Sequence, residues 1–482
     1  MNFNWNLFID LGIIAGALLL ATFLRSKVRF FQKFLVPNAL TAGLILLPLY
    51  NFVFPLVGVT AAGLGRLAYH LLSISFIAMS LRTGRPTAAV GENRLFATVI
   101  MVLSQFAIQV LAGLLLTFLF IQTIYPDLYE PFGYLLPLGF VQGPGQAFAI
   151  GESWTGVGIE GAGSVGLTFA AIGFILATFG GVFLINFGIR RGWVTREELA
   201  PLRESRVRTG VYPRGSERPV GAVMTTETEA IDSMSFNAGL VLLCYFLTYL
   251  FLQFITWALS LVGPLGEELA VNLWGISFIF AALIGLAVKH LIQAIRVDHV
   301  IDTRTMNRIS GLSVDVMVTA AIGAISLVAV SQYWVPILVV ALVGALVTFT
   351  TVPWIASRLF RDHKFHRMLL IFGVSTGTLS TGLALLRVID PDFETPVASD
   401  YTYAAGITFV FAIPFILSIS LPVRAFVTGN FTYFWMAVGI AAAYLVFVFI
   451  SYLLLARDQA FAGPRQVWLR HGKDVGTDGG KG

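Results

Sequence analysis

Long apolar runs separated by short polar stretches make up most of the chain. Because a bilayer-crossing helix needs roughly 20 mostly apolar residues, this pattern predicts about eleven membrane-spanning helices. The expected spans are 7–24, 34–54, 64–81, 95–124, 161–189, 236–262, 271–292, 309–330, 334–355, 401–423 and 431–455. Two glycine-rich apolar pieces, 131–160 and 368–396, remain outside these spans. The fold class that follows is an all-α membrane protein.

The two remaining pieces occupy equivalent places in the order of spans. Each follows four spans and precedes a fifth, and a long polar stretch at 190–235 separates the two sets. The sets then have opposite orientations in the membrane, which predicts two inverted five-span repeats, at 1–189 and 236–423. We therefore expect hairpin one (131–160) and hairpin two (368–396) to be re-entrant. Broken backbone of this kind is tolerated only where protein or a water-filled cavity surrounds it.

The composition agrees with a membrane location, and the charges set an orientation. Hydrophobic residues form 57% of the 482 residues, charged residues form 12%, and the mean hydropathy is +0.83. All but three of the 31 lysines and arginines fall on one side of the expected spans, the exceptions being Arg66, Arg387 and Arg424. The positive-inside rule places the N-terminus outside, and places the linker 190–235 and the tail of the last segment, 424–482, in the cytoplasm. Topology explains the basic residues, so the expected partner is the lipid bilayer and not nucleic acid.

Hairpin one carries the sequence GFVQGPGQAFAIG, which breaks a helix in an apolar setting. Glycine lets backbone N–H groups approach a ligand closely, and Pro144 prevents a continuous helix. The two glutamine amides offer hydrogen-bond donors and acceptors without a buried charge. The predicted substrate contacts are Gln142, Gly143, Gly145 and Gln146. A kinked helix with glycines at packing contacts remains the alternative.

Hairpin two reads GVSTGTLSTGLALL, in which five hydroxyl residues stand close to three glycines. Hydroxyl and carbonyl oxygens are the ligands that hard cations such as sodium prefer, and half-helix N-termini favour carboxylates. We predict substrate contacts at Ser380 and Thr381. We predict ion contacts at Thr376 and Thr378. Single hydroxyls also hydrogen-bond helix backbones in membrane proteins, so the clustering of five carries the prediction.

Two charged residues in apolar surroundings are further candidates. The planar guanidinium of Arg387 suits bidentate recognition of a substrate carboxylate. Alternatively, Arg387 pairs with Asp390 or Asp392, or reaches the cytoplasmic interface. Asp315 lies inside an expected span, where it either contributes an oxygen ligand to a cation or forms an ion pair with a neighbouring helix. No catalytic group or metal-binding cluster assembles at readable spacing, so neither an enzyme nor a resident cofactor is expected.

Five stretches of the chain carry a resemblance to a known family. They are FLVPNALTAGLILLPL, ISFIAMSLRTG, GFVQGPGQAFAIG, VGLTFAAIGFILATFGGVF and GVSTGTLSTGLALL. Together with the two inverted repeats, they resemble the bacterial sodium/glutamate symporter family over nearly the whole chain to about residue 425. The glycine motif of that family in hairpin one maps onto residues 142–145, with Gln142 in place of the leading glycine.

The resemblance implies sodium-driven symport of an amino-acid dicarboxylate, with glutamate as the first candidate, in a bacterial inner membrane. It also implies a homodimer, a mobile domain that carries both hairpins past a fixed scaffold, and no cofactor besides the coupling sodium ion. The family has ten spans, so the extra span and tail at 424–482 depart from it. Two alternatives stay open: a proton-coupled transporter of another carboxylate that uses Asp315, and an ion channel whose hairpins form a filter.

Overall fold

The computed structural model describes residues 5–34, 36–82, 92–193, 209–216, 218, 220–227, 229–261, 263, 270, 273–390, 395–463 and 467–468. These residues form helices, turns and loops, and contain no β-strand. Ten helices among them are long and apolar enough to cross a membrane. The predicted all-α class is therefore confirmed, and the ten helices agree with a location in a membrane. The expected linker 190–235 lies partly, and the tail beyond residue 468 wholly, outside the described residues.

The described residues hold one candidate span fewer than expected, and α14 accounts for the difference. The expected span 309–330 forms α14 (Thr303–Gly323) and the short helix α15 (Leu327–Gln332). α14 is not among the ten apolar helices, because Arg308 and Asp315 make its sequence more polar. The remaining expected spans each contain or overlap one of the ten.

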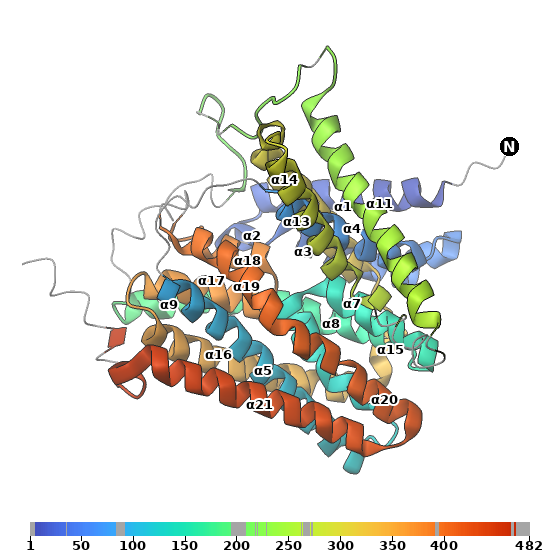
Figure 1. Ribbon diagram of the computed structural model, residues 1–482, viewed down its shortest axis with the longest axis vertical. Coiled ribbons are helices and arrows are strands. Elements are labelled where there is room, and N and C mark those ends of the chain that lie inside the picture. The colour runs from blue at the N-terminus through green and yellow to red at the C-terminus, as the bar shows by residue number, and fades with distance from the viewer. Residues whose placement is uncertain are drawn as a thin grey trace, which may run out of the picture.

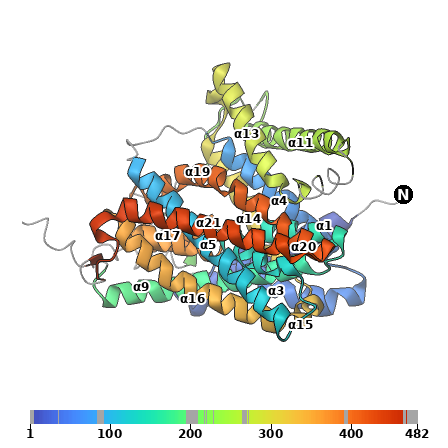
Figure 2. The ribbon, with the colours of Figure 1, turned by 60° about the horizontal axis from the view of Figure 1, so that its bottom comes forward.

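The helices divide into two packed groups, which Figure 1 shows in different halves of the molecule. The flanking bundle consists of α1 (Asn6–Lys27), α3 (Asn38–Pro48), α4 (Ala62–Ser80), α11 (Ser233–Ser260), α13 (Ser277–Ala294) and α14. The hairpin bundle consists of both hairpins and α5 (Glu92–Gln122), α8 (Ala162–Ile175), α9 (Gly181–Arg190), α16 (Trp334–Leu359), α19 (Val397–Ser418), α20 (Ser420–Thr428) and α21 (Phe431–Ala456). After a turn of the view, α11 and α13 again lie apart from α16 and α21 (Figure 2).

Each hairpin is made of two helical legs. Hairpin one consists of the turns η3 (Glu130–Tyr134), α6 (Leu135–Pro137) and η4 (Leu138–Gln142), followed by α7 (Pro144–Ser153). Hairpin two consists of α17 (Lys364–Thr376) and α18 (Leu379–Leu386). In both cases the two legs pack against each other, so each segment folds back on itself.

The two bundles meet mainly along α7. α4 and α14 pack against α7, and α14 also packs against α8. At this contact Gly145 lies beneath Met317 and Leu72, and a Cβ added to Gly145 would lie 2.9 Å from the Met317 sulfur. The surrounding apolar side chains come from both bundles and include Leu167 and Phe174 of α8. The small residue at position 145 therefore lets the bundles approach closely.

Packing inside the flanking bundle repeats between the two halves of the chain. α3 packs against α14 while α13 packs against α4, and α4 and α14 pack against each other. α1 packs on α3, and α11 packs on α13. Each of these helices has a counterpart in the other half that makes the corresponding contact, which is the pattern that a two-fold relation between repeats would produce.

Polar side chains fix the starts of several helices. The Asp302 carboxylate accepts hydrogen bonds from the backbone N–H groups of Thr305 (3.0 Å) and Arg304 (3.2 Å) at the start of α14. The Asn430 amide oxygen accepts from the Thr432 N–H at 3.0 Å at the start of α21. Such caps satisfy backbone donors that the first helical turn leaves without partners, and each is typically worth about 1 kcal/mol.

Candidate functional site

Hairpin one is broken at Gly143. The backbone there has φ 90° and ψ 176°, a conformation essentially reserved for glycine. Gln142 is the last residue of η4 before this break. Pro144 follows as the first residue of α7, where its missing N–H removes no helical hydrogen bond. The glycine and proline therefore mark the point at which the chain reverses direction.

Hairpin two is broken between α17 and α18. α17 ends at Thr376, Gly377 takes an irregular conformation (φ −155°, ψ −103°), and Thr378 is the N-cap residue of α18. The two legs approach so closely that a Cβ added to Gly373 would lie 2.7 Å from the Gly382 Cα. Glycine on both legs therefore permits a narrow hairpin.

The two breaks contact each other inside the hairpin bundle. A Cβ added to Gly143 would lie 2.7 Å from Thr378 Cγ2 and 3.4 Å from the Gly377 carbonyl oxygen. The hydroxyl oxygens of Thr378 and Thr381 are 3.3 Å apart beside this contact. Residues 142–144 and 376–378 thus form a single feature, the tip junction, from segments far apart in the sequence.

Helix ends converge on the tip junction. α7 and α18 start there, and the partial positive charge at their N-termini favours an anion. α17 ends there, so its last carbonyl groups and the negative end of its dipole favour a cation. Thr376 and Thr381 are buried, and so is the Gln146 amide oxygen, which has no hydrogen-bond partner among the described residues. The tip junction therefore offers different environments to an anion and a cation.

A buried glutamine that the sequence analysis missed reaches hairpin two from α5. The Gln109 Nε2 donates hydrogen bonds to the Ser375 carbonyl oxygen (3.1 Å) and to the Thr348 hydroxyl (3.0 Å). The Gln109 Oε1 and the Ser375 Oγ are both buried and lack partners among the described residues. A buried polar atom without a partner costs about 1–3 kcal/mol, so an added ligand would be stabilised here. The available sequence signal was the spacing of Gln105 and Gln109, one helical turn apart in an apolar span.

The structure brings most of the predicted site residues together. The tip junction includes Gly143, Thr376 and Thr378, and Thr381 lies one turn away on α18. The other predicted residues of hairpin one flank its break, namely Gln142, Gly145 and Gln146. Ser380 lies on α18, and its side chain lies outside the described part of the structure.

Two predicted residues are not brought to the tip junction. Arg387 follows the 8-residue helix α18, which puts it about 12 Å along the helix from the break, and its side chain is exposed. Its alternative partner Asp392 lies outside the described residues. Asp315 is exposed on α14 in the flanking bundle. A direct ligand role for either residue stays a prediction without geometric support.

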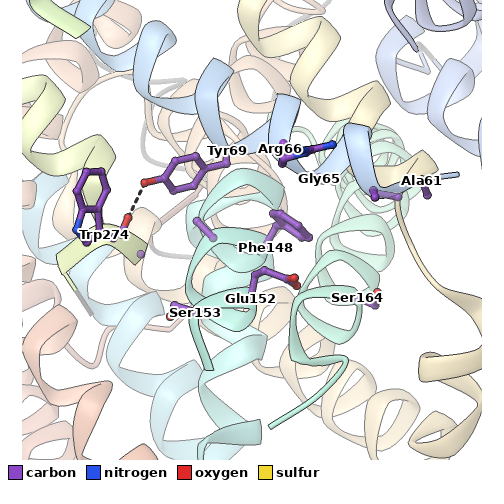
Figure 3. A pocket seen from close by; sticks show the side chains of 13 residues that line it. Ala61, Gly65, Arg66, Tyr69, Phe148, Glu152, Ser153, Ser164 and Trp274 are labelled. Carbon is purple, nitrogen blue, oxygen red and sulfur yellow. Dashed lines mark hydrogen bonds between the residues drawn. The ribbon is translucent and has the colours of Figure 1, made fainter. Parts of the chain in front are cut away.

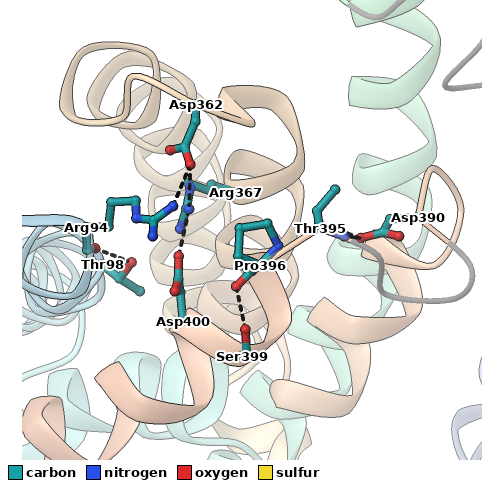
Figure 4. A network of polar contacts seen from close by, with 9 residues as sticks. All are labelled: Arg94, Thr98, Asp362, Arg367, Asp390, Thr395, Pro396, Ser399 and Asp400. Atoms are coloured by element: carbon teal, nitrogen blue, oxygen red, sulfur yellow. Dashed lines mark hydrogen bonds and ion pairs between the residues drawn. The ribbon is translucent and has the colours of Figure 1, made fainter. Parts of the chain in front are cut away.

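An ion-pair network holds the base of hairpin two (Figure 4). The Arg367 guanidinium of α17 lies 2.7 Å from the Asp400 carboxylate of α19, and both side chains are 2% exposed. Arg367 also lies 3.3 Å from Asp362, which Arg94 of α5 contacts at 3.1 Å. The network joins α17 to α19 and α5, so it anchors hairpin two within its own bundle.

Comparison with protein-family models, with curated proteins and with solved structures finds no match to this chain. Membership of the symporter family therefore stays an expectation from the sequence. The tip junction is the independent structural observation that bears on function.

Proposed function

We propose that the protein is a secondary active transporter that couples sodium entry to the uptake of a small anionic substrate, with glutamate as the first candidate. The observation that carries the proposal is the tip junction, where the breaks of two helical hairpins meet at Gly143 and Thr378. Paired discontinuous helices in the two halves of a membrane protein are the usual setting of a transporter's substrate site. A bacterial inner membrane and a homodimer belong to the same proposal and come from the sequence resemblance.

The substrate carboxylate is assigned to the N-termini of α7 and α18. The first backbone N–H groups of each helix have no partner within the helix, and their partial positive charge attracts an anion. The hydroxyls of Thr378 and Thr381 lie beside these helix ends, and Gln142 is the last residue before the break. These side chains are assigned further hydrogen bonds to the substrate. The buried Gln146 amide oxygen, which lacks a donor, suits an ammonium group of the substrate.

The coupling sodium ion is assigned to the C-terminal end of α17. Helix C-termini and unwound backbone carbonyls coordinate sodium in transporters of this architecture. The Gln109 Oε1 and the Ser375 Oγ lie at this end without hydrogen-bond partners among the described residues. The Thr376 hydroxyl donates to the Phe372 carbonyl at 2.7 Å, which leaves its lone pairs available to a cation. All of these ligands are neutral oxygens.

The hairpin bundle is proposed to move against the flanking bundle in an elevator-type cycle. The two hairpins lie in one bundle, so a ligand at the tip junction would move with it. The contact between bundles along α7 is built around apolar side chains, including Leu72 and Met317, which can shift without breaking ion pairs. The exchanged packing of α3 with α14 and α13 with α4 supports an inverted-repeat origin of this arrangement.

Uptake of labelled glutamate into liposomes that contain the purified protein tests this function. An inward sodium gradient should drive accumulation, and replacement of sodium by potassium should abolish it. Uptake driven by a proton gradient without sodium would favour the proton-coupled alternative, and single-channel currents would favour a channel. The proposal would be contradicted if neither glutamate nor any other dicarboxylate tested showed sodium-dependent uptake.

A further inference from the structure

A cavity of about 720 Å³ lies between the two bundles, beside α7 (Figure 3). Its volume is within the range of about 300–1,000 Å³ that is typical of ligand pockets. Gly65, Arg66 and Tyr69 of α4 line one wall, and Phe148 and Glu152 of α7 line the facing wall. The cavity thus begins about one helical turn beyond the tip junction. The expected orientation of the chain puts it on the outer side of the membrane.

Arg66 and Glu152 bring opposite charges to this cavity from different bundles. Both side chains are exposed, and neither forms an ion pair with another residue in the described parts of the chain. In Figure 3 the Phe148 ring lies against Gly65, between α4 and Glu152. Because no described residue forms an ion pair with either charge, both remain available to a ligand that carries an anionic and a cationic group.

The other polar groups of the wall already have partners within the protein. The Tyr69 hydroxyl donates to the Trp274 carbonyl oxygen at 2.8 Å, and the Ser153 hydroxyl donates to the Ile150 carbonyl oxygen at 2.6 Å. The rings of Phe148 and Trp274 leave apolar surface for the carbon atoms of a ligand. The wall chemistry therefore leaves Arg66 and Glu152 as the groups that would fix a ligand's orientation.

We propose that the cavity is an outer entry site for a free α-amino acid, in which Arg66 binds the α-carboxylate and Glu152 binds the ammonium group. The inference deepens the proposed transport function, on which it rests, by naming the substrate class at a second site. A guanidinium binds a carboxylate through two parallel charge-assisted hydrogen bonds, and a carboxylate accepts hydrogen bonds from an ammonium group. A dicarboxylate without an amino group would still pair with Arg66, but Glu152 would repel it.

The entry site is separate from the tip junction. Leu72 and Met317 pack over Gly145, between the cavity wall at Phe148 and the break at Gly143. An amino acid in the cavity would therefore reach the tip junction only after the bundles shift at this apolar contact. Capture in the cavity would precede that shift and would raise the local concentration of substrate.

Accessibility of a single introduced cysteine tests the entry site. Cys244 is the only cysteine in the sequence and is buried, so Cys244→Ala supplies the background. In that background, Ser153→Cys puts a thiol in the cavity, and Thr123→Cys puts a control thiol at an exposed position after α5. Both should react with a membrane-impermeant maleimide added outside. Glutamate should slow labelling of Ser153→Cys only, and glutarate at the same concentration should not.

Charge variants distinguish direct binding from a conformational effect of substrate bound elsewhere. With Ser153→Cys as the reporter, Arg66→Gln should raise the half-protecting glutamate concentration about tenfold or more, and Arg66→Lys should raise it less. Glu152→Gln should weaken protection by glutamate and allow glutarate to protect. Protection by glutamate that is unchanged in both neutral variants, or equal protection by glutarate in the parent, overturns the proposal.

Three further outcomes separate this inference from its alternatives. Protection that depends on phosphatidylethanolamine in the liposomes and not on added amino acid would identify a lipid headgroup site and overturn the proposal. Labelling requires no transport. Intact sodium-driven uptake without protection would therefore reject the entry site alone, whereas protection without uptake would reject the transport function and leave the binding site standing.

Discussion

Gly143 of hairpin one and Thr378 of hairpin two are in contact, so closely that a Cβ added to Gly143 would lie 2.7 Å from Thr378 Cγ2. The contact joins the start of α7 to the start of α18, and the end of α17 lies beside it. A side chain at position 143 cannot be added unless the Thr378 side chain or the backbone beside it shifts. The start of α7 can therefore lie against the start of α18 because residue 143 has no side chain.

Gly143→Ala should lower sodium-driven uptake about tenfold or more. The alanine would have to adopt φ near 90° and ψ near 176°, which costs about 1–3 kcal/mol, and would also push against Thr378. About 1.4 kcal/mol corresponds to a factor of ten in rate or affinity. Initial uptake rates at several substrate concentrations in liposomes measure the effect.

Gly158→Ala is the matched control for that variant. Gly158 has φ 91° and ψ 10°, and no atom lies within 4 Å of the position that its Cβ would take. Its substitution should cost only the milder left-handed strain of about 1 kcal/mol and should leave uptake close to wild type. Equal uptake defects in the two alanine variants would contradict a special role for the tip junction.

A double variant that combines Gly143→Ala with Thr378→Ser should recover part of the uptake lost in Gly143→Ala alone.

Gln109→Leu should raise the sodium concentration needed for half-maximal uptake about tenfold. The substitution removes the Gln109 Oε1, which is the assigned sodium ligand. It also leaves the Ser375 carbonyl without its 3.1 Å hydrogen bond, which costs about 1–3 kcal/mol. The apparent affinity for glutamate at saturating sodium should change much less. Titrating sodium at fixed glutamate measures the sodium requirement. Titrating glutamate at saturating sodium measures the apparent affinity for glutamate.

Gln105→Leu provides the comparison on the same helix. The Gln105 Oε1 accepts from the Thr351 hydroxyl at 3.1 Å, and its Nε2 donates to Ser104 at 3.3 Å, so both ends have protein partners. We expect lower thermal stability from this variant and an unchanged sodium requirement. A shift in the sodium requirement of the same size as in Gln109→Leu would show that loss of packing, and not loss of an ion ligand, explains both.

The sequence allowed the hairpin breaks to be predicted because glycine, proline and hydroxyl residues contrast with an apolar background. Gly143 and Thr378 both lie at breaks in the structure, as expected. Local patterns could not show that the two breaks meet, since that contact depends on how α7, α17 and α18 pack in three dimensions. Gln109 was missed for the same reason, because its partners Thr348 and Ser375 belong to distant helices.

Charged residues in apolar runs were the less informative signal. Arg387 and Asp315 were singled out because a charge is costly in a membrane. That cost does not show which way the side chain points or whether it faces the binding site. Both side chains are exposed and lie away from the tip junction. Arg66 and Glu152 gain interest only once α4 and α7 are seen to enclose one cavity.

Asp400→Asn should destabilise the protein by about 3–5 kcal/mol, because it leaves the buried Arg367 guanidinium without its 2.7 Å partner. Asp362→Asn should cost no more than about 1 kcal/mol, since the Asp362 side chain is 35% exposed. The midpoint of thermal unfolding in detergent measures both. Similar losses in the two variants would mean that the buried pair does not dominate the network.

Stability should fall in acid partly through Asp302, the N-cap residue of α14. Burial alone would raise the pKa of its carboxyl, but hydrogen bonds from the Val223 N–H and from the Thr305 hydroxyl and N–H outweigh burial and lower the pKa. The folded pKa then lies below the unfolded value of about 3.9. The stabilisation is therefore complete above the unfolded pKa and is lost as the pH falls through the folded pKa.

Asp302→Asn isolates this contribution, because asparagine is also a good N-cap residue but does not ionise. The wild-type protein should be more stable than the variant at pH 6, and the difference in unfolding midpoint should narrow as the pH approaches 3. The gap narrows because protonation removes the charge that the Thr305 hydroxyl contacts at 2.7 Å and the Val223 N–H contacts at 2.9 Å. A gap that stays constant across this range would show that the charge of Asp302 adds nothing to the cap, and that its hydrogen-bonding geometry alone stabilises α14.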